Sequence, residues 1–180
     1  RGVLPSGGMP VEFLTDEQAA AYGRYTGPVP RADLDRYFFL DDADRALIEP
    51  KRREANRLGY AVQLCTARYL GTFVTDLSQV PEEVVVYLAE QLDITDPACL
   101  SDYPSRAQTR HDHAEEIRRE YGFAEFSEHR PDLEEWLRAQ VWTTTDGPKA
   151  LFDGTSAWLR GRGVLLPGVS TLGPAGLPGP

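Results

Sequence analysis

The stretch Lys51–Phe73, KRREANRLGYAVQLCTARYLGTF, decides the fold class, because it joins a dense basic head to a long amphipathic helix. At about 100° per residue, one stripe of this helix is apolar and is expected to face a core. The stripe consists of Leu58, Ala61, Val62, Cys65 and Tyr69. Arg53, Arg57 and Arg68 cluster beside it. The spacing therefore predicts a helix over residues 52–71 with one buried face and one basic edge.

Helical signals also dominate the rest of the chain, so we predict an all-α fold. Three local signals set the ends of the other helices: a capping-box pair, proline at a first turn, and glycine or proline after a periodic run. They are expected at about 15–25, around Leu34, Tyr37 and Phe38, from Asp41 or Asp42 through Leu47, and at 81–92, 106–121, 131–142 and 148–160. Residues 101–105 are predicted to form a turn. Val164–Leu166 is a candidate for a short strand, whereas VVVYL at Val84–Leu88 fits a helix better.

The chain is expected to divide into two helical subdomains between short terminal segments. Residues 1–8 are predicted to be a leader and 9–100 an N-terminal helical subdomain that binds DNA. A second helical subdomain covers 101–172. Residues 173–180, GPAGLPGP, form a disordered tail, because proline removes a backbone donor and fixes φ.

Charge is distributed unevenly. The 180 residues carry a net charge of −9 and have a pI near 4.8, whereas residues 51–70 hold five basic side chains against one acidic one. An acidic protein is repelled by polyanions, so binding to nucleic acid must come from this local patch. The alternative is a solvated flank whose arginines pair with the acidic helices upstream.

Composition also bounds the class of protein. Hydrophobic residues at 41% and charged residues at 26% are typical of a folded protein. Two cysteines without close spacing argue against a disulfide framework or a zinc site. No apolar run is long enough to cross a bilayer, and the first residues do not resemble a signal peptide. We therefore predict a soluble cytoplasmic protein with no membrane partner.

A second mixed face lies on the helix expected at 106–121. Arg106, Arg110, His113, Ile117 and Tyr121 share this face by the same count. It could lie half on the core and half on a phosphate backbone; equally, its arginines could pair with Glu115, Glu116 and Glu120. His111 and His113 diverge by about 200° on a helix, so they cannot chelate one metal ion.

Catalytic and cofactor motifs are missing from the sequence. It has no GxSxG, HExxH or glycine-rich phosphate loop, and Cys65 lies on an apolar stripe where a thiol usually packs. Asp41, Asp42 and Asp44 suggest the start of a helix rather than a metal site. We predict no catalytic residues, no metal and no cofactor. The tryptophans Trp136, Trp142 and Trp158 are expected to fill the core of the C-terminal half.

Several segments in order resemble the N-terminal region of transposases of the Tn-three family, the large enzymes of replicative bacterial transposons. They are MPVEFLTDEQAAAYGRY (9–25), RYFFLDDADRALI (36–48), NRLGYAVQLCTARYLGTF (56–73), VPEEVVVYLAEQL (80–92), RxxTRxxHxxEIRxxYGF (106–123) and DGPKALFDGTSAWLRGRGVLLPGVSTL (146–172). In that family this region is helical and helps to bind the terminal inverted repeats of the transposon. Strand cleavage belongs to an Asp-Asp-Glu core much further on, before which this chain ends.

The resemblance implies a role in DNA transposition, with double-stranded transposon ends as the partner. The matching positions that it assigns to DNA are Arg53, Asn56, Arg57, Arg106, Arg110 and His113; Arg68 joins them from the basic edge of the long helix. Arg53 and Arg57 are expected on phosphates and Asn56 or Arg110 nearer base edges. The alternatives are a helical module that associates with full-length transposase or another protein, and a remnant without function.

Overall fold

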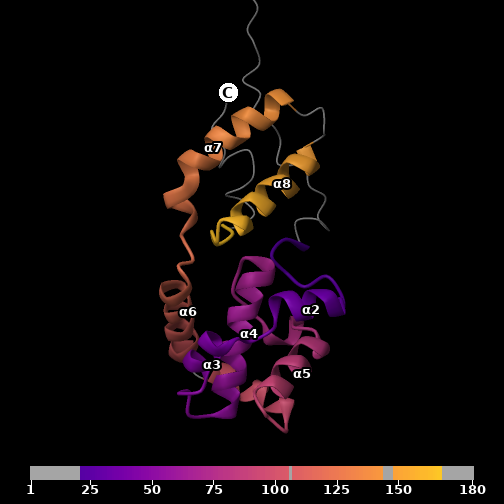
Figure 1. Ribbon diagram of the computed structural model, residues 1–180, viewed down its shortest axis with the longest axis vertical. Helices are drawn as coiled ribbons and strands as arrows, with labels where there is room; N and C mark the ends of the chain where they lie inside the picture. The colour runs from indigo at the N-terminus through magenta and orange to yellow at the C-terminus, as the bar shows by residue number, and fades with distance from the viewer. Residues whose placement is uncertain (1–20, 106, 144–147, 168–180) are drawn as a thin grey trace, which may run out of the picture. The chain divides into compact units, whose positions relative to one another are not determined.

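The computed structural model describes residues 21–105, 107–143 and 148–167, and the all-α prediction is confirmed for them (Figure 1). Two compact units divide the chain between Phe123 and Ala124. The first unit is Gly23–Phe123, and the second joins Ala21 and Tyr22 to the described residues from Ala124 onward. The elements in order are α2 (Arg31–Tyr37), α3 (Asp42–Ile48), α4 (Glu54–Leu70), η2 (Leu77–Gln79), α5 (Glu82–Gln91), η3 (Pro97–Ser105), α6 (Ala107–Tyr121), α7 (Phe126–Thr143) and α8 (Pro148–Gly161).

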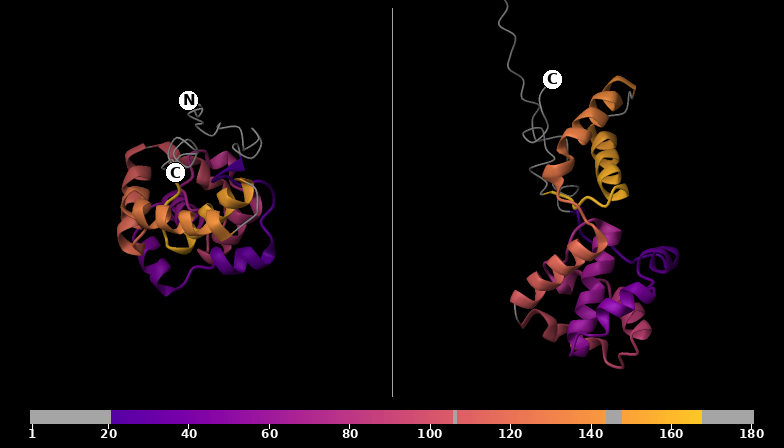
Figure 2. Two further views of the ribbon diagram at one scale, coloured as in Figure 1. Left: turned by 90° about the horizontal axis from the view of Figure 1, so that it is seen from above. Right: turned by 60° about the vertical axis from the view of Figure 1, so that its left-hand side comes forward.

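Helix α4 is the central helix of the first unit. Helices α2, α3, α5 and α6 and the 3-10 segment η3 all contact it, as Figures 1 and 2 show from several directions. Every residue from Leu58 to Ala67 is therefore buried, not only the predicted stripe. More than the one expected face is buried, because neighbours cover the middle of α4 on all sides.

Two buried polar residues of α4, Gln63 and Thr66, tolerate this burial because each finds an internal partner. The side-chain amide of Gln63 donates to the carbonyl oxygen of Val74 at 3.0 Å and accepts from its backbone N–H at 2.8 Å. The hydroxyl groups of Thr66 and Tyr25 are hydrogen-bonded at 2.7 Å. Buried polar groups that are paired in this way avoid the cost of lost hydration.

Gly59 allows η3 to pack directly on α4. A Cβ atom at this position would lie 2.2 Å from the ring of Tyr103, which is fully buried against the helix. The turn predicted at 101–105 is part of this longer 3-10 segment. A residue with any side chain at position 59 would push the ring away.

In the first unit, most helix ends coincide with local sequence signals. Asp41 caps α3, and its side chain and that of Asp44 form a reciprocal capping box. Gly71 ends α4 in the left-handed conformation at φ 74°. Pro81 directly precedes α5, whose first turn carries two glutamates. The predicted start of a helix at 15 lies outside the described residues.

In the second unit, α7 and α8 pack around a core of their own, whose buried residues are Leu133, Leu137, Phe152, Trp158, Leu159 and Val164. Trp136 packs at its edge, with its ring 6.1 Å from that of Trp158, while the side chain of Trp142 lies outside the description. Helix α7 begins at Phe126 and holds Pro131 inside it, so the start predicted at 131 is wrong. The strand candidate at Val164 is a single parallel bridge to Ala124.

The division between the units differs from the boundary expected after residue 100. Helix α6 belongs to the first unit, because its residues His113 and Ile117 are buried in the core around α4. Over the described ranges, no helix is both long and apolar enough to span a bilayer.

Candidate nucleic-acid interface

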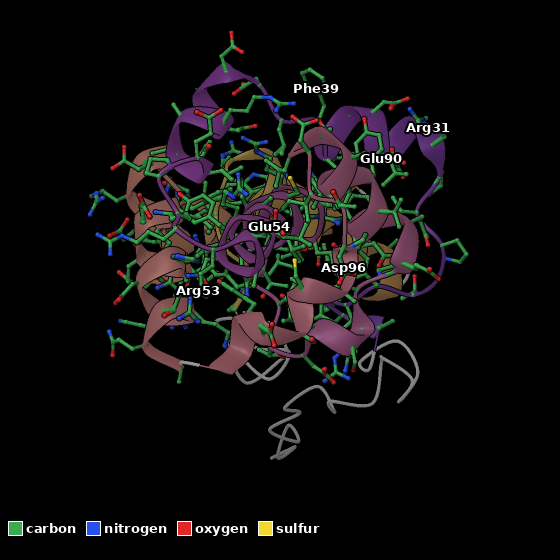
Figure 3. The ribbon with its side chains drawn as sticks, turned by 90° about the horizontal axis from the view of Figure 1, so that it is seen from below. Arg31, Phe39, Arg53, Glu54, Glu90 and Asp96 are labelled. Atoms are coloured by element: carbon green, nitrogen blue, oxygen red, sulfur yellow. The ribbon has the colours of Figure 1, made fainter. Side chains whose placement is uncertain are left out.

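The basic head of the sequence forms the link between α3 and α4, residues 49–53. Buried Ile48 holds one end of this link and buried Ala55 the other. Arg52 and Arg53 are exposed between them, and neither forms an ion pair within the part of the chain that the structure describes. In Figure 3, Arg53 lies on the face that displays the start of α4. These two guanidinium groups are therefore available to an anion.

Two further predicted residues lie in the first turns of α4, next to Arg53. Asn56 is half-buried, and no side-chain hydrogen bond engages it among the described residues. Arg57 is 30% exposed and faces Glu54 at 3.7 Å. The structure thus brings Arg53, Asn56 and Arg57 together within one helical turn.

Carboxylates border this basic surface. Glu54 and Asp96 lie on the same face as Arg53 (Figure 3). Cys99 lies in the neighbouring segment η3. Burial raises the pKa of its thiol, and the negative charges of the nearby Glu54 and Asp96 raise this pKa further. The surface is therefore a small basic site with an acidic border.

Lys51 belongs to the same link but points inward. Its Nζ atom donates to Oε2 of Glu116 on α6 at 2.5 Å, and it lies 4.7 Å from the ring centroid of Tyr60. Its side chain is only 17% exposed. Of the three consecutive basic residues, one is thus held by the protein and two project from it.

Arg68 lies about 22 Å from Arg53 along α4, at a rise of 1.5 Å per residue, and it is engaged internally. Its guanidinium group donates to both carboxylate oxygens of Asp44, at 2.5 and 2.9 Å. Tyr121 donates to the same carboxylate at 2.5 Å and stacks under the arginine. These contacts join α3, α4 and α6 through one buried carboxylate.

The ionisation of this network follows from its hydrogen bonds. Burial opposes the charge on Asp44, but the hydrogen bonds from Arg68 and Tyr121 outweigh it and hold the pKa of the carboxyl below its usual value. Burial alone would lower the pKa of Arg68, and the bond to Asp44 reverses this and raises it. Arg68 therefore stabilises the fold as a charged internal group.

The basic positions predicted on α6 separate in the structure. Arg110 is partly exposed and donates to the backbone oxygen of Thr75 at 3.2 Å. His113 is buried, stacks on Tyr103 and shares a 3.0 Å hydrogen bond with its hydroxyl. Burial, with Lys51 nearby, lowers the pKa of His113 to about 4, so its imidazole is neutral at pH 7. Arg106 lies outside the described residues.

Alternative chemistry has little support in the described parts of the chain. They contain no group of three or more His, Cys, Asp or Glu side chains that could hold a metal ion. Asp41 and Asp44 form the capping box, which confirms the prediction that this acidic cluster starts a helix. Burial raises the pKa of Cys65 to about 12, so its thiol stays protonated in the core.

With this geometry established, comparison with known proteins identifies the family. The chain belongs to the family described as Domain of unknown function (DUF4158), whose model matches residues 13–174. It is 43% identical over 166 residues to the transposase for transposon gamma-delta of Escherichia coli (strain K12), which covers 91% of this chain and 17% of that protein. It is 35% identical over 163 residues to the transposase for transposon Tn1546 of Enterococcus faecium, covering 89% and 16%.

A third relative matches a shorter part. The transposase for transposon Tn501 of Pseudomonas aeruginosa is 45% identical over 91 residues, which covers 51% of this chain and 9% of that protein. These similarities confirm the resemblance to the N-terminal region of Tn-three family transposases. The chain spans about a sixth of the length of the first two relatives, and it corresponds to a region of a transposase.

Proposed function

We propose that this chain is a DNA-binding region of a transposase that recognises terminal inverted repeats in transposition, and that it acts on double-stranded DNA in the cytoplasm. The observation that carries the proposal is the pair of exposed arginines, Arg52 and Arg53, which project from the α3–α4 link without an ion-pair partner among the described residues. Arg57 extends the same surface. The transposase relatives make DNA the relevant polyanion.

The physical chemistry of the surface suits a phosphate backbone. A guanidinium group donates two parallel hydrogen bonds to phosphate. The amino end of α4 carries the positive end of the helix dipole, and the Arg53 side chain does not cap it. With two or three phosphates contacted, the logarithm of the affinity should fall with the logarithm of salt concentration at a slope of about −2 to −3.

The predicted residues contribute differently to this proposal. Arg53 and Arg57 are assigned to phosphates, and Asn56 and Arg110 to positions nearer base edges. Arg68 and His113 have internal partners in the structure, so we assign them to the fold and leave them out of the contact surface. Arg106 stays a prediction from the sequence.

The test is a fluorescence-anisotropy titration of the chain with a terminal-inverted-repeat duplex of a related transposon and with a scrambled duplex, at two salt concentrations. We expect preference for the repeat. Arg53→Ala/Arg57→Ala should weaken binding to both duplexes about tenfold and make the salt slope shallower by about 2, because both side chains contact phosphates. Asn56→Ala should reduce the preference for the repeat.

Arg36→Ala is the matched control, since Arg36 is an exposed arginine of the same unit on α2, over the ring of Tyr37. It should leave affinity and salt slope unchanged. Arg36→Ala removes one charge and the double variant removes two, so a loss of log affinity in Arg36→Ala of half that in the double variant, or more, would show only a general effect of net charge. A folded wild-type chain that binds neither duplex would reject the proposal.

Association with another transposase molecule is the second candidate, and Phe39 is the observation that favours it. Among the described residues it is the exposed large hydrophobic side chain, at 57%, although its neighbours Phe38 and Leu40 are buried. An exposed aromatic ring can bury its apolar area against another protein. Concentration-dependent association that is lost in Phe39→Ser would support this candidate.

A further inference from the structure

We infer that Lys51 and Glu116 are positioning residues: their ion pair holds the α3–α4 link against α6 so that Arg52 and Arg53 face outward. The inference rests on the proposed DNA-binding function, because it assigns the orientation of that surface. It also separates Lys51 from the arginines that follow it, although the sequence presents all three as one basic run.

The geometry of the link supports this assignment. The backbone N–H of Lys51 donates to the carbonyl oxygen of Ile48 at 3.0 Å, which turns the chain immediately after α3. The side chain then reaches Glu116 at 2.5 Å, with exposed fractions of 17% and 25% for the two partners. Within the described residues this is the ion pair that connects the link to α6. Arg52 and Arg53 follow directly and are exposed.

The ion pair lies against a buried aromatic part of the core. Lys51 lies over the ring of Tyr60, whose edge meets the ring of His113 at 5.1 Å between centroids. His113 is stacked on Tyr103, which packs on Gly59. Contacts with a carboxylate and with a buried aromatic ring confine this cation to one conformation. The cation can therefore fix the residues beside it.

A positioning role and a simple charge effect predict opposite signs for one variant. Glu116 is negative and lies close to the basic surface, so its removal should strengthen binding to a polyanion if only charge matters. If Glu116 positions the link, Glu116→Gln should weaken binding, because Lys51 is released and the arginines lose their fixed orientation. Glu120→Gln is the matched control, since Glu120 is on the same helix but pairs with exposed Arg119.

Backbone amide exchange of Glu49 and Lys51, whose N–H groups donate to Arg45 and Ile48, and DNA anisotropy should be measured together on the full chain. Glu116→Gln should speed exchange in the link about tenfold, by making local opening easier. It should also weaken DNA binding about threefold. Glu120→Gln should leave exchange unchanged and bind DNA equally well or more tightly. Lys51→Met should behave like Glu116→Gln, and Lys51→Arg should restore slow exchange, since arginine can pair with the carboxylate and stack on the ring.

Unchanged exchange in Glu116→Gln, or tighter DNA binding than wild type, would overturn the inference. The exchange measurement does not need DNA. If no variant and no wild-type chain binds DNA, the proposed function fails, and the exchange rates still decide whether Lys51 and Glu116 hold the link.

Discussion

The two ends of α4 carry the same kind of residue in opposite roles. At the amino end, Arg53 projects into solvent without an ion-pair partner in the described chain. Near the carboxyl end, Arg68 forms two hydrogen bonds with Asp44, whose side chain is only 1% exposed. The difference lies in what the neighbouring elements bring to each end, because α3 and α6 place a carboxylate and a tyrosine beside Arg68 alone. Residue type therefore does not distinguish a binding arginine from a structural one.

The largest effect is expected from one substitution near the carboxyl end of α4, where the arginine is paired. Arg68→Met removes the partner of a buried carboxylate, so we expect a loss of about 3–5 kcal/mol in the free energy of unfolding. Urea unfolding followed by circular dichroism measures it. Asp42→Asn, a change at an exposed acidic residue of the same helix as Asp44, is the control and should cost far less. A small loss in Arg68→Met would mean that the network contributes little to stability.

A pH titration tests the buried core beside the link. The pKa of His113 is lowered in the folded chain from 6.5 to about 4, so between these values the unfolded chain binds a proton that the folded chain does not. Stability should therefore be lost as pH falls from 6.5 towards 4, by on the order of 2–3 kcal/mol.

Thermal unfolding at a series of pH values would show the decline. His113→Gln should flatten the profile in this window, whereas His111→Gln, at an exposed position of the same helix, should not. The low pKa of Asp44 adds loss of stability only at lower pH, since a carboxyl whose pKa is lowered by folding stabilises above its unfolded pKa. A flat wild-type profile between pH 6.5 and 4 would contradict the assignment of His113 to the core.

The next largest loss of stability is expected from a change in packing in the middle of α4. Gly59→Ala places a methyl group where the ring of Tyr103 lies, so we expect a loss of about 1–3 kcal/mol despite the better helix propensity of alanine. Denaturant unfolding would measure it. Gly161→Ala, at a position where an added Cβ meets nothing within 4 Å, is the control. A stabilised Gly59→Ala would show that η3 moves away without cost.

The smallest effect on stability is expected at the exposed end. Arg53→Met, the same change as at Arg68, should alter the free energy of unfolding by less than about 0.5 kcal/mol, since the side chain has no partner to lose. The same variant should weaken DNA binding. A loss of stability comparable with that of Arg68→Met would show that Arg53 is structural and would remove it from the proposed surface.

Sequence reasoning located helices well where the signal is local. The cap at Asp41 or Asp42, the end of the long helix near residue 71 and the start of a helix at Pro81 depend on neighbours within a few residues. The structure has Asp41 as the cap, Gly71 at the end of α4 and Pro81 directly before α5. Sequence reasoning failed where the outcome depends on distant elements. Pro131 suggested a helix start, yet α7 begins at Phe126. The burial of Gln63 and Thr66 depends on Val74 and Tyr25, which helical periodicity cannot reveal.

The candidate site shows the same limit. The sequence alone indicated a concentration of basic residues at 51–57, and Arg53, Asn56 and Arg57 do lie together in the structure. It could not indicate that Lys51 turns inward, because its partner Glu116 is 65 residues away. The available signal is a carboxylate on the helix expected at 106–121, since Glu116 is one of the predicted partners for the arginines of that helix.

The amino-acid sequence by itself determined the helical class, most helix ends and the local concentration of positive charge, because these follow from neighbours along the chain. Only the tertiary structure decided which charges remain available. Asp44 pairs with Arg68 and accepts a hydrogen bond from Tyr121, Glu116 pairs with Lys51, and Tyr103 stacks on His113 and shares a hydrogen bond with it. The physical reason is that a charged or polar side chain is neutralised by a partner within a few ångströms in space, and folding brings such partners from residues far apart in sequence.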